Sequence, residues 1–226
     1  MIRAILILVF LIVSILPSHA VSFSVGGIRL HKDVRAMRDI KREHVVAQSL
    51  DVSCGPAGLA TLFNFYLDDP TSENEIIADL LNSTPLEKVR ARKGFSLLDL
   101  KKFAQSRGYK VTGYKMDMKF LRDFKSPVLV PISFKRYKHF VIVRGIVGDR
   151  IFLADPASGN VSMKTDKFEA MWMGGVGMVI EKPRAVARRS IPLKITSRDL
   201  TIVDHQSVCK IANQMAVRTG IFPGEF

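Results

Sequence analysis

The order of hydrophobic and polar positions divides the chain into a helical first half and a strand-rich second half. After Ser53, apolar residues recur at helical spacing as far as Tyr66, and the run stops before Asp68-Asp69-Pro70. Because nearly all sides of this segment are apolar, the pattern predicts a helix buried in the core.

Two serines mark the starts of further helices. Ser72 and Glu75 fit a capping box, in which the hydroxyl and the carboxylate each accept a backbone N–H at the helix start. Ser96 precedes a second apolar run, and Gly108 stands where a left-handed residue would end that helix.

The second half consists of short β-branched or aromatic runs separated by proline and glycine. These runs are Tyr109–Tyr114, Val128–Phe134, His139–Ile146, Arg150–Ala154 and Val176–Glu181. Gly148-Asp149 favours a hairpin turn, so the runs on either side of it are expected to pair in antiparallel fashion. The sequence therefore predicts an α+β domain with N-terminal helices packed on an antiparallel sheet.

The N-terminal residues have the layout of a signal peptide. Arg3 precedes an apolar run that ends at Leu16, and Pro17 and Ala20 follow in the cleavage region. The run is shorter than the ~20 residues of a membrane-spanning helix, although a retained N-terminal anchor is the alternative. We therefore expect export to the periplasm.

The remaining chain is expected to form one compact domain with two extensions. Residues 21–44 form an N-terminal extension with a strand over Val21–Val34, and residues 45–183 form the main domain. Residues 184–226 form a basic C-terminal extension with a helix around Asp199–Val217. No transporter helices and no phosphate-binding loop are recognised in the sequence.

The net charge of +13 indicates anionic partners such as acidic polypeptides or an anionic membrane surface. Nucleic acid is not expected, because no zinc, helix-turn-helix or RNA-binding motif is present. Solvated basic faces that only keep the protein soluble are an equally good explanation. No cofactor and no metal ion are expected.

Cys54 is the first candidate for chemistry. It lies at the predicted start of the buried helix, where unpaired N–H groups and the helix dipole favour a thiolate. Gly55 is interpreted as leaving the approach to the sulfur open, and Pro56 suits a first helical turn. The other cysteine, Cys209, is interpreted as a buried thiol, but a Cys54–Cys209 disulfide is an open alternative in an oxidising compartment.

A nucleophilic cysteine needs a base, and His139 opens the most strongly β-patterned run. The return strand of the Gly148-Asp149 hairpin ends at Asp155, so its carboxylate is expected beside the imidazole, where it would orient the ring. A core histidine and a turn aspartate are the structural alternatives. The other histidines after the N-terminal segment, His31, His44 and His205, are interpreted as surface residues.

Gln48 lies on the stretch that enters the Cys54 helix. Its amide and the Cys54 backbone N–H could converge on an oxyanion. Alone this signal is weak, because a glutamine in a loop more often braces the loop.

These segments together resemble the double-glycine leader peptidases, a papain-like cysteine peptidase family that trims leaders from bacteriocin precursors. The resemblance runs from about Val45 to Glu181 and rests on Ser53-Cys54-Gly55-Pro56-Ala57 with Gln48, His139 and Asp155 in order. It implies the papain-like fold, with Cys54 as nucleophile, His139 as base, Asp155 as its orienter and Gln48 in the oxyanion hole.

With its export signal, the chain is most similar to the stand-alone periplasmic peptidases of functional-amyloid secretion systems. The resemblance implies an exported endopeptidase that cleaves an extended, small-residue-rich segment of a secreted polypeptide, with amyloid subunits or secretion components as partners. Two alternatives remain: a non-catalytic peptide-binding chaperone or adaptor on the same fold, and acyl transfer on other substrates.

Overall fold

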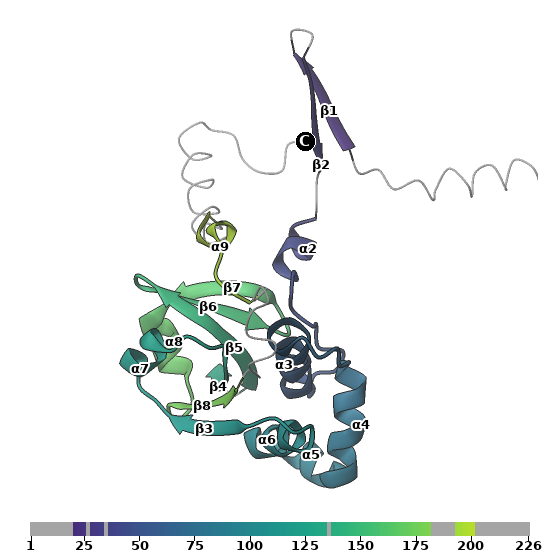
Figure 1. Cartoon of the computed structure of the whole chain (residues 1–226), viewed down its shortest axis with the longest axis vertical. Helices are drawn as coiled ribbons and strands as arrows, with labels where there is room; N and C mark the ends of the chain where they lie inside the picture. The colour runs from purple at the N-terminus through teal and green to yellow at the C-terminus, as the bar shows by residue number, and fades with distance from the viewer. Residues whose placement is uncertain (1–19, 26–27, 34–35, 135–136, 182–192, 202–226) are drawn as a thin grey trace, which may run out of the picture. The chain divides into compact units, whose positions relative to one another are not determined.

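The computed structural model describes residues 20–25, 28–33, 36–134, 137–181 and 193–201 (Figure 1). The chain divides into an N-terminal unit that ends at Ile40 and a main unit that begins at Lys41. The predicted signal peptide lies almost wholly outside the described residues. Within them, no helix combines the length and the apolar character needed to cross a membrane.

The N-terminal unit contains a β-hairpin where the sequence predicted one strand. Strands β1 (Ala20–Val25) and β2 (Ile28–Asp33) pair in antiparallel fashion, with Val25 opposite Ile28. The prediction over Val21–Val34 was wrong because it passed over Gly26-Gly27, a pair typical of tight hairpin turns. The short helix α2 (Met37–Lys41) follows.

The main unit begins with the predicted helical region. The elements are α3 (Cys54–Leu62), its π-helical continuation η1 (Phe63–Leu67), α4 (Glu73–Ser83), α5 (Leu86–Arg92) and α6 (Leu97–Ser106). Every residue of α3 is buried, as the pattern after Ser53 predicted. The α3–η1 segment ends at Asp68, which has a left-handed backbone with φ of 60°.

The two predicted helix starts differ in detail. Ser96 and Asp99 form a complete capping box at the start of α6. At α4 the Ser72 hydroxyl accepts the Glu75 N–H, but the predicted return contact from the Glu75 carboxylate is not formed. Glu75 instead accepts a hydrogen bond from Arg107 at 2.7 Å, because the charged guanidinium is the stronger donor.

The sheet has six antiparallel strands in the order β3-β8-β4-β5-β6-β7. Their bounds are β3 (Val111–Lys115), β4 (Val128–Phe134), β5 (Tyr137–Val147), β6 (Arg150–Asp155), β7 (Gly159–Lys164) and β8 (Val176–Ile180). Two short helices, α7 (Met118–Asp123) and α8 (Thr165–Met171), connect them. The α+β prediction is confirmed, although β7, α5, α7 and α8 were not foreseen.

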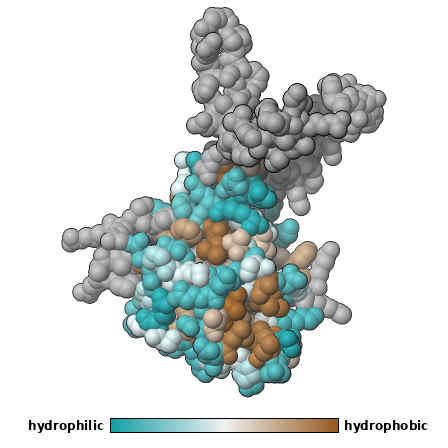
Figure 2. Space-filling model, turned by 90° about the vertical axis from the view of Figure 1, so that its right-hand side faces the viewer, coloured by the Kyte–Doolittle hydropathy of each residue, from teal (hydrophilic) through white to brown (hydrophobic). Residues whose placement is uncertain are grey.

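Two hydrophobic cores lie on opposite faces of the sheet. One joins α3, α4 and α6 to alternate strand residues such as Leu129 and Ile142. The other joins α7 and α8 to the intervening residues, such as Val130 and Val141. This alternation is the expected one for a sheet covered on both faces. Exposed apolar side chains remain on the helical side, where Figure 2 shows hydrophobic surface.

Two glycines in α3 allow this helix to pack closely. A side chain at Gly55 would meet Leu100 of α6 at 2.9 Å, and one at Gly58 would meet Leu129 of β4 at 3.0 Å. Close packing against Leu100 therefore explains the glycine at position 55, and this contact could not be predicted from the sequence.

The β5–β6 hairpin contains a β-bulge at Arg144. Next to the turn, Val147 pairs with Arg150, whereas Val143 pairs with Leu153, so Arg144 is the extra residue. Beyond a bulge, the pairing between the two strands is shifted by one residue. The turn itself is the predicted one, with φ of 60° at Gly148.

The Arg144 side chain holds a segment that follows the sheet. It is nearly buried, with 5% of its side chain exposed, and pairs with both carboxylate oxygens of Asp199 at 2.7 and 3.0 Å. Asp199 lies on α9 (Ser197–Thr201), and Leu193 before it is buried. The rest of the predicted helix up to Val217 lies outside the described residues.

Candidate active site

Cys54 is the first residue of α3 and is 6% exposed. Ser53 precedes the helix without a side-chain cap, so no hydroxyl covers the N–H groups of the first turn. Cys54 is a free thiol in the structure, and Cys209, its predicted alternative partner, lies outside the described residues. The sulfur thus lies where the helix presents its unpaired donors.

His139 and Asp155 form the bonded pair that the hairpin argument predicted. Nε2 of His139 lies 2.7 Å from Oδ1 of Asp155, and the two side chains are 9% and 15% exposed. The same carboxylate oxygen accepts the Ala157 N–H at 2.8 Å. The imidazole is therefore held by a carboxylate that is itself fixed by the backbone.

The bulge at Arg144, and not the turn alone, brings these two side chains to one face. In an uninterrupted ladder Asp155 would stand opposite Ile142, three residues from His139 and hence on the other face. With the bulge, Ile142 pairs with Ala154, so Asp155 falls in line with Val141. The predicted proximity is confirmed, but the stated reason was incomplete.

The His139–Asp155 pair is strongly polarised. Burial has the largest single effect on His139 and lowers its pKa. The hydrogen bond to Asp155, the nearby Cys54 sulfur and the negative charges of both outweigh burial and raise the pKa to about 9. Burial also acts against ionisation of Asp155, but the bond to His139 and its charge lower the pKa of that carboxyl. Both groups are therefore charged at neutral pH.

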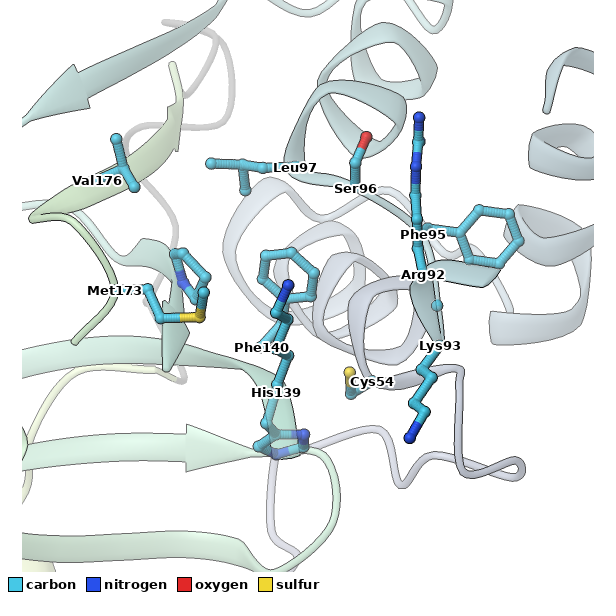
Figure 3. Close-up of a pocket in the computed structure, with 13 residues that line it drawn as sticks. Cys54, Arg92, Lys93, Phe95, Ser96, Leu97, His139, Phe140, Met173 and Val176 are labelled. Atoms are coloured by element: carbon cyan, nitrogen blue, oxygen red, sulfur yellow. The ribbon is translucent and has the colours of Figure 1, made fainter. Parts of the chain in front are cut away.

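The second ring nitrogen of His139 is turned to the cysteine. Nδ1 is buried and accepts or donates no hydrogen bond within the described residues, although the Cys54 sulfur is near enough to raise the pKa of the ring. Figure 3 shows the two side chains next to each other, one from α3 and one from the sheet. Nucleophile and base are often loosely aligned without substrate.

Gln48 is anchored beside the same pair. Its backbone N–H donates to the Pro156 carbonyl at 3.0 Å, directly after Asp155. Its side-chain Nε2 donates to the Leu50 carbonyl at 3.0 Å, and its buried Oε1 has no partner within the described part of the chain. An amide nitrogen carries two hydrogens, so a second donor remains besides the one bonded to Leu50, and the amide also lies beside the Tyr137 hydroxyl, whose pKa it acts to lower.

Long-range contacts that the sequence did not reveal hold the loop between Gln48 and Cys54. The Glu73 carboxylate accepts the Ser49 N–H at 3.0 and 3.1 Å, and Thr61 accepts the Val46 N–H at 2.9 Å. Tyr137, which precedes His139 by two residues, donates its hydroxyl to the Asp51 carbonyl at 2.8 Å. Only the position of Tyr137 near His139 could have drawn attention to it.

A cleft of about 280 Å³ opens next to Cys54 and His139. Residues 92–97 form one wall, and Met173 and Val176 lie across from them (Figure 3). The lining is mainly apolar, with the cations Arg92, Lys93 and Lys138. No group of acidic, histidine or cysteine residues suited to a metal ion is found among the described residues.

Of the other histidines, His44 is in the described part of the main unit and does not line this cleft. His44 is exposed and makes an edge contact with Phe65 at 5.3 Å between ring centroids. His31 lies on β2, and His205 lies outside the described residues.

A free cysteine at a helix start, facing an imidazole–carboxylate pair on a sheet, defines a papain-like cysteine peptidase. The profile of the Peptidase C39 family matches residues 42–184. The chain belongs to this family and is a cysteine peptidase, as the resemblance in the sequence indicated.

Two similar proteins that are named as proteases support the same conclusion. The chain is 35% identical over 163 residues, 71% of each chain, to the "Probable functional amyloid protease FapD" of Pseudomonas fluorescens. It is 34% identical over 155 residues, 69% of this chain and 68% of the relative, to the protein of the same name in Pseudomonas aeruginosa.

A solved structure supports the fold. The peptidase domain of Streptococcus ComA, a bi-functional ABC transporter involved in quorum sensing, aligns with a TM-score of 0.53 and 22% identity. The alignment covers 63% of this chain and all of that domain. At this identity the likeness concerns the fold alone.

Proposed function

We propose that Cys54 is the nucleophile of this peptidase, with His139 as its base, Asp155 as the orienter of the base and Gln48 as an oxyanion donor. One observation carries the proposal: the Nε2 of His139 is bonded to Asp155 at 2.7 Å, which leaves Nδ1 for the cysteine. A carboxylate on one ring nitrogen fixes the tautomer that the other nitrogen needs for proton transfer.

The groups act in an ordered sequence. The Cys54 thiolate attacks the scissile carbonyl carbon, and the carbonyl oxygen becomes an oxyanion held by the Cys54 N–H and the second amide hydrogen of Gln48, which turns to it when substrate binds. His139, as imidazolium, gives its proton to the leaving amine, and the C–N bond breaks to leave a thioester. His139 then takes a proton from water, whose oxygen attacks the thioester; the C–S bond breaks, the acid is released, and the Cys54 thiolate and the His139 imidazolium are restored.

We infer that the substrate is an extended, small-residue-rich segment of a secreted polypeptide. The cleft beside the sulfur is small, about 280 Å³, and mainly apolar, which favours small side chains at the scissile bond. An extended substrate would gain backbone hydrogen bonds in such a cleft. The name of the FapD relatives supports a role in functional-amyloid processing, and leader removal is the alternative.

We also propose that the enzyme acts in the periplasm after export. The positive charge of Arg3, the apolar run to Leu16 and the small residue Ala20 at the expected cleavage site support this location. Cell fractionation and N-terminal sequencing of the native protein test it. A mature chain that begins near Val21 in the periplasmic fraction is expected, and a retained Met1 in the membrane fraction would contradict export.

The catalytic proposal is tested by digestion of secreted polypeptides encoded beside this chain. Wild type, Cys54→Ala and Cys209→Ala are compared, with products identified by mass spectrometry. We expect cleavage by wild type and by Cys209→Ala, since the second thiol has no part in the chemistry, and none by Cys54→Ala. Equal product from wild type and Cys54→Ala would refute Cys54 as the nucleophile.

A further inference from the structure

Tyr137 lies at the start of β5, two residues before His139, and contacts both sides of the active site. Its ring stacks on the His139 imidazole, with 5.9 Å between centroids and 29° between planes. That is an offset stacked arrangement, which is favourable for aromatic rings. Tyr137 is 45% exposed, whereas His139 is 8% exposed, so the tyrosine lies on the solvent side of the pair.

The Tyr137 hydroxyl reaches the other half of the site. It donates to the Asp51 carbonyl at 2.8 Å, across 86 residues of sequence. Asp51 belongs to the loop that joins Gln48 to Cys54. One side chain therefore contacts the base through its ring and the loop of the nucleophile through its hydroxyl.

The hydroxyl keeps its proton under conditions in which the enzyme is expected to work. Burial has the largest effect and raises the pKa of Tyr137, and negative charge at Cys54 adds to the rise. The amide of Gln48, beside the hydroxyl, acts in the opposite direction and is outweighed. Since the hydroxyl proton is donated to the Asp51 carbonyl, it is not available to act as an acid toward substrate.

We propose that Tyr137 is a positioning residue that ties the Gln48–Cys54 loop to strand β5 and keeps the His139 imidazole in place. The proposal rests on the assigned roles of Cys54 and His139 and adds a residue to them. A thiolate–imidazolium pair made from two separate elements needs such a connection, because small shifts between the elements reduce proton transfer strongly. The alternative role for an exposed tyrosine at a cleft is direct contact with substrate.

Alkylation of Cys54 by iodoacetamide tests the positioning role without a peptide substrate. In Tyr137→Phe the stack remains and the bond to Asp51 is lost, so the alkylation rate at pH 7 is expected to fall about fivefold. In Tyr137→Ala both contacts are lost, and a fall of about 20-fold is expected. All variants carry Cys209→Ala so that only one thiol reacts.

Tyr114→Phe is the matched control. Tyr114 packs against Phe120 and Phe124, away from the cleft, and its loss of a hydroxyl is expected to leave the alkylation rate unchanged. Thermal unfolding of each variant shows whether it is folded. A second readout is the Nε2–H proton signal of His139 in NMR, which should exchange faster with water in Tyr137→Ala than in Tyr137→Phe.

The outcomes separate this inference from the proposed function. If the Tyr137 variants alkylate at the wild-type rate and only KM for peptide rises, Tyr137 is a substrate contact and the inference is overturned. If Tyr137→Ala does not fold, the Tyr137→Phe rate and its NMR signal still decide. If wild-type Cys54 itself reacts no faster than free cysteine, the assigned role of Cys54 fails, whatever Tyr137 does.

Discussion

The two halves of the candidate active site are fixed to different degrees. On the sheet, His139 and Asp155 are bonded to each other at 2.7 Å, and the carboxylate is held by a backbone N–H as well. On the helical side, Cys54 makes no hydrogen bond to His139, and the Gln48 amide is used by a neighbouring carbonyl. The sheet thus supplies a charged pair that is already assembled, whereas the helical side supplies groups that must align on substrate.

Removing His139 should have the largest effect on this comparison. In His139→Ala the thiol would lose its proposed base and the leaving group its proposed proton donor, so kcat/KM should fall roughly 10⁴-fold or more. Steady-state cleavage of a peptide substrate measures the change. His44→Ala, at an exposed position, is the control and should retain wild-type kcat/KM. A residual rate within tenfold of wild type would show that the base is another residue.

Replacing Gln48 should have a smaller effect that falls on kcat. Gln48→Ala removes one oxyanion donor and is expected to lower kcat about 100- to 1000-fold with little change in KM. Gln105→Ala, at an exposed position on α6, is the matched control. A Gln48→Ala enzyme with normal kcat would mean that this amide only braces its loop.

The pH dependence sharpens the comparison from the sheet side. Because the pKa of His139 is raised to about 9, the imidazolium that we propose as the proton donor to the leaving group persists up to that pH. Activity should therefore fall about tenfold per unit above pH 9. In Asp155→Asn the charge that raises this pKa is lost, so the alkaline limit should move to lower pH. An unchanged alkaline limit in that variant would contradict the assigned pair.

The same shifts affect stability. Because the pKa of His139 is raised on folding, its contribution to the free energy of unfolding is complete below pH 6.5, the pKa in the unfolded chain. That contribution is lost as the pH rises through about 9, the pKa in the folded protein. Because the pKa of Asp155 is lowered on folding, its contribution to the free energy of unfolding is present above pH 3.8, the pKa in the unfolded chain. That contribution is lost as the pH falls below 3.8 toward the pKa in the folded protein. Urea unfolding across pH should show that Asp155→Asn loses most stability between these limits. Equal loss at pH 10 would argue against the pair as its source.

The cations of the cleft should have the smallest effect. Lys93 and Lys138 are exposed, so each would favour an acidic residue in the substrate by about two- to fivefold in kcat/KM. Paired peptides with glutamate or lysine beside the scissile bond measure this preference in wild type and Lys138→Glu. The preference should weaken at high salt, as expected for screened charges. Lys115→Glu, which is outside the cleft, is the control.

Two parts of the candidate site could be predicted from short segments: the helix that begins at Cys54 and the contact between His139 and Asp155. Cys54 was found because a helix start favours a thiolate, and Asp155 because a turn at Gly148 returns its strand toward His139. What escaped prediction depends on contacts between distant segments. Tyr137 meets Asp51 across 86 residues, and Glu73 meets Ser49 across 24. Neither partner shows any local pattern that marks the contact.

The missed elements have similar explanations. Strand β7 (Gly159–Lys164) is polar and partly exposed, so its sequence lacks a strong strand pattern, and pairing with β6 creates it. Helix α5 was not predicted either, because Val89 is its one buried residue and its sequence therefore lacks a helical pattern of apolar positions.

Because of the bulge at Arg144, His139 and Asp155 face the same side of the sheet. Whether they do so depends on whether the number of residues between them is odd or even. Deleting one residue anywhere in the hairpin would turn the imidazole and the carboxylate to opposite sides of the sheet while leaving the strands paired. A second single-residue change in the turn would bring them back to the same side. Among relatives, insertions and deletions in this hairpin should therefore occur in compensating pairs, because any single one would separate the carboxylate of Asp155 from the imidazole of His139.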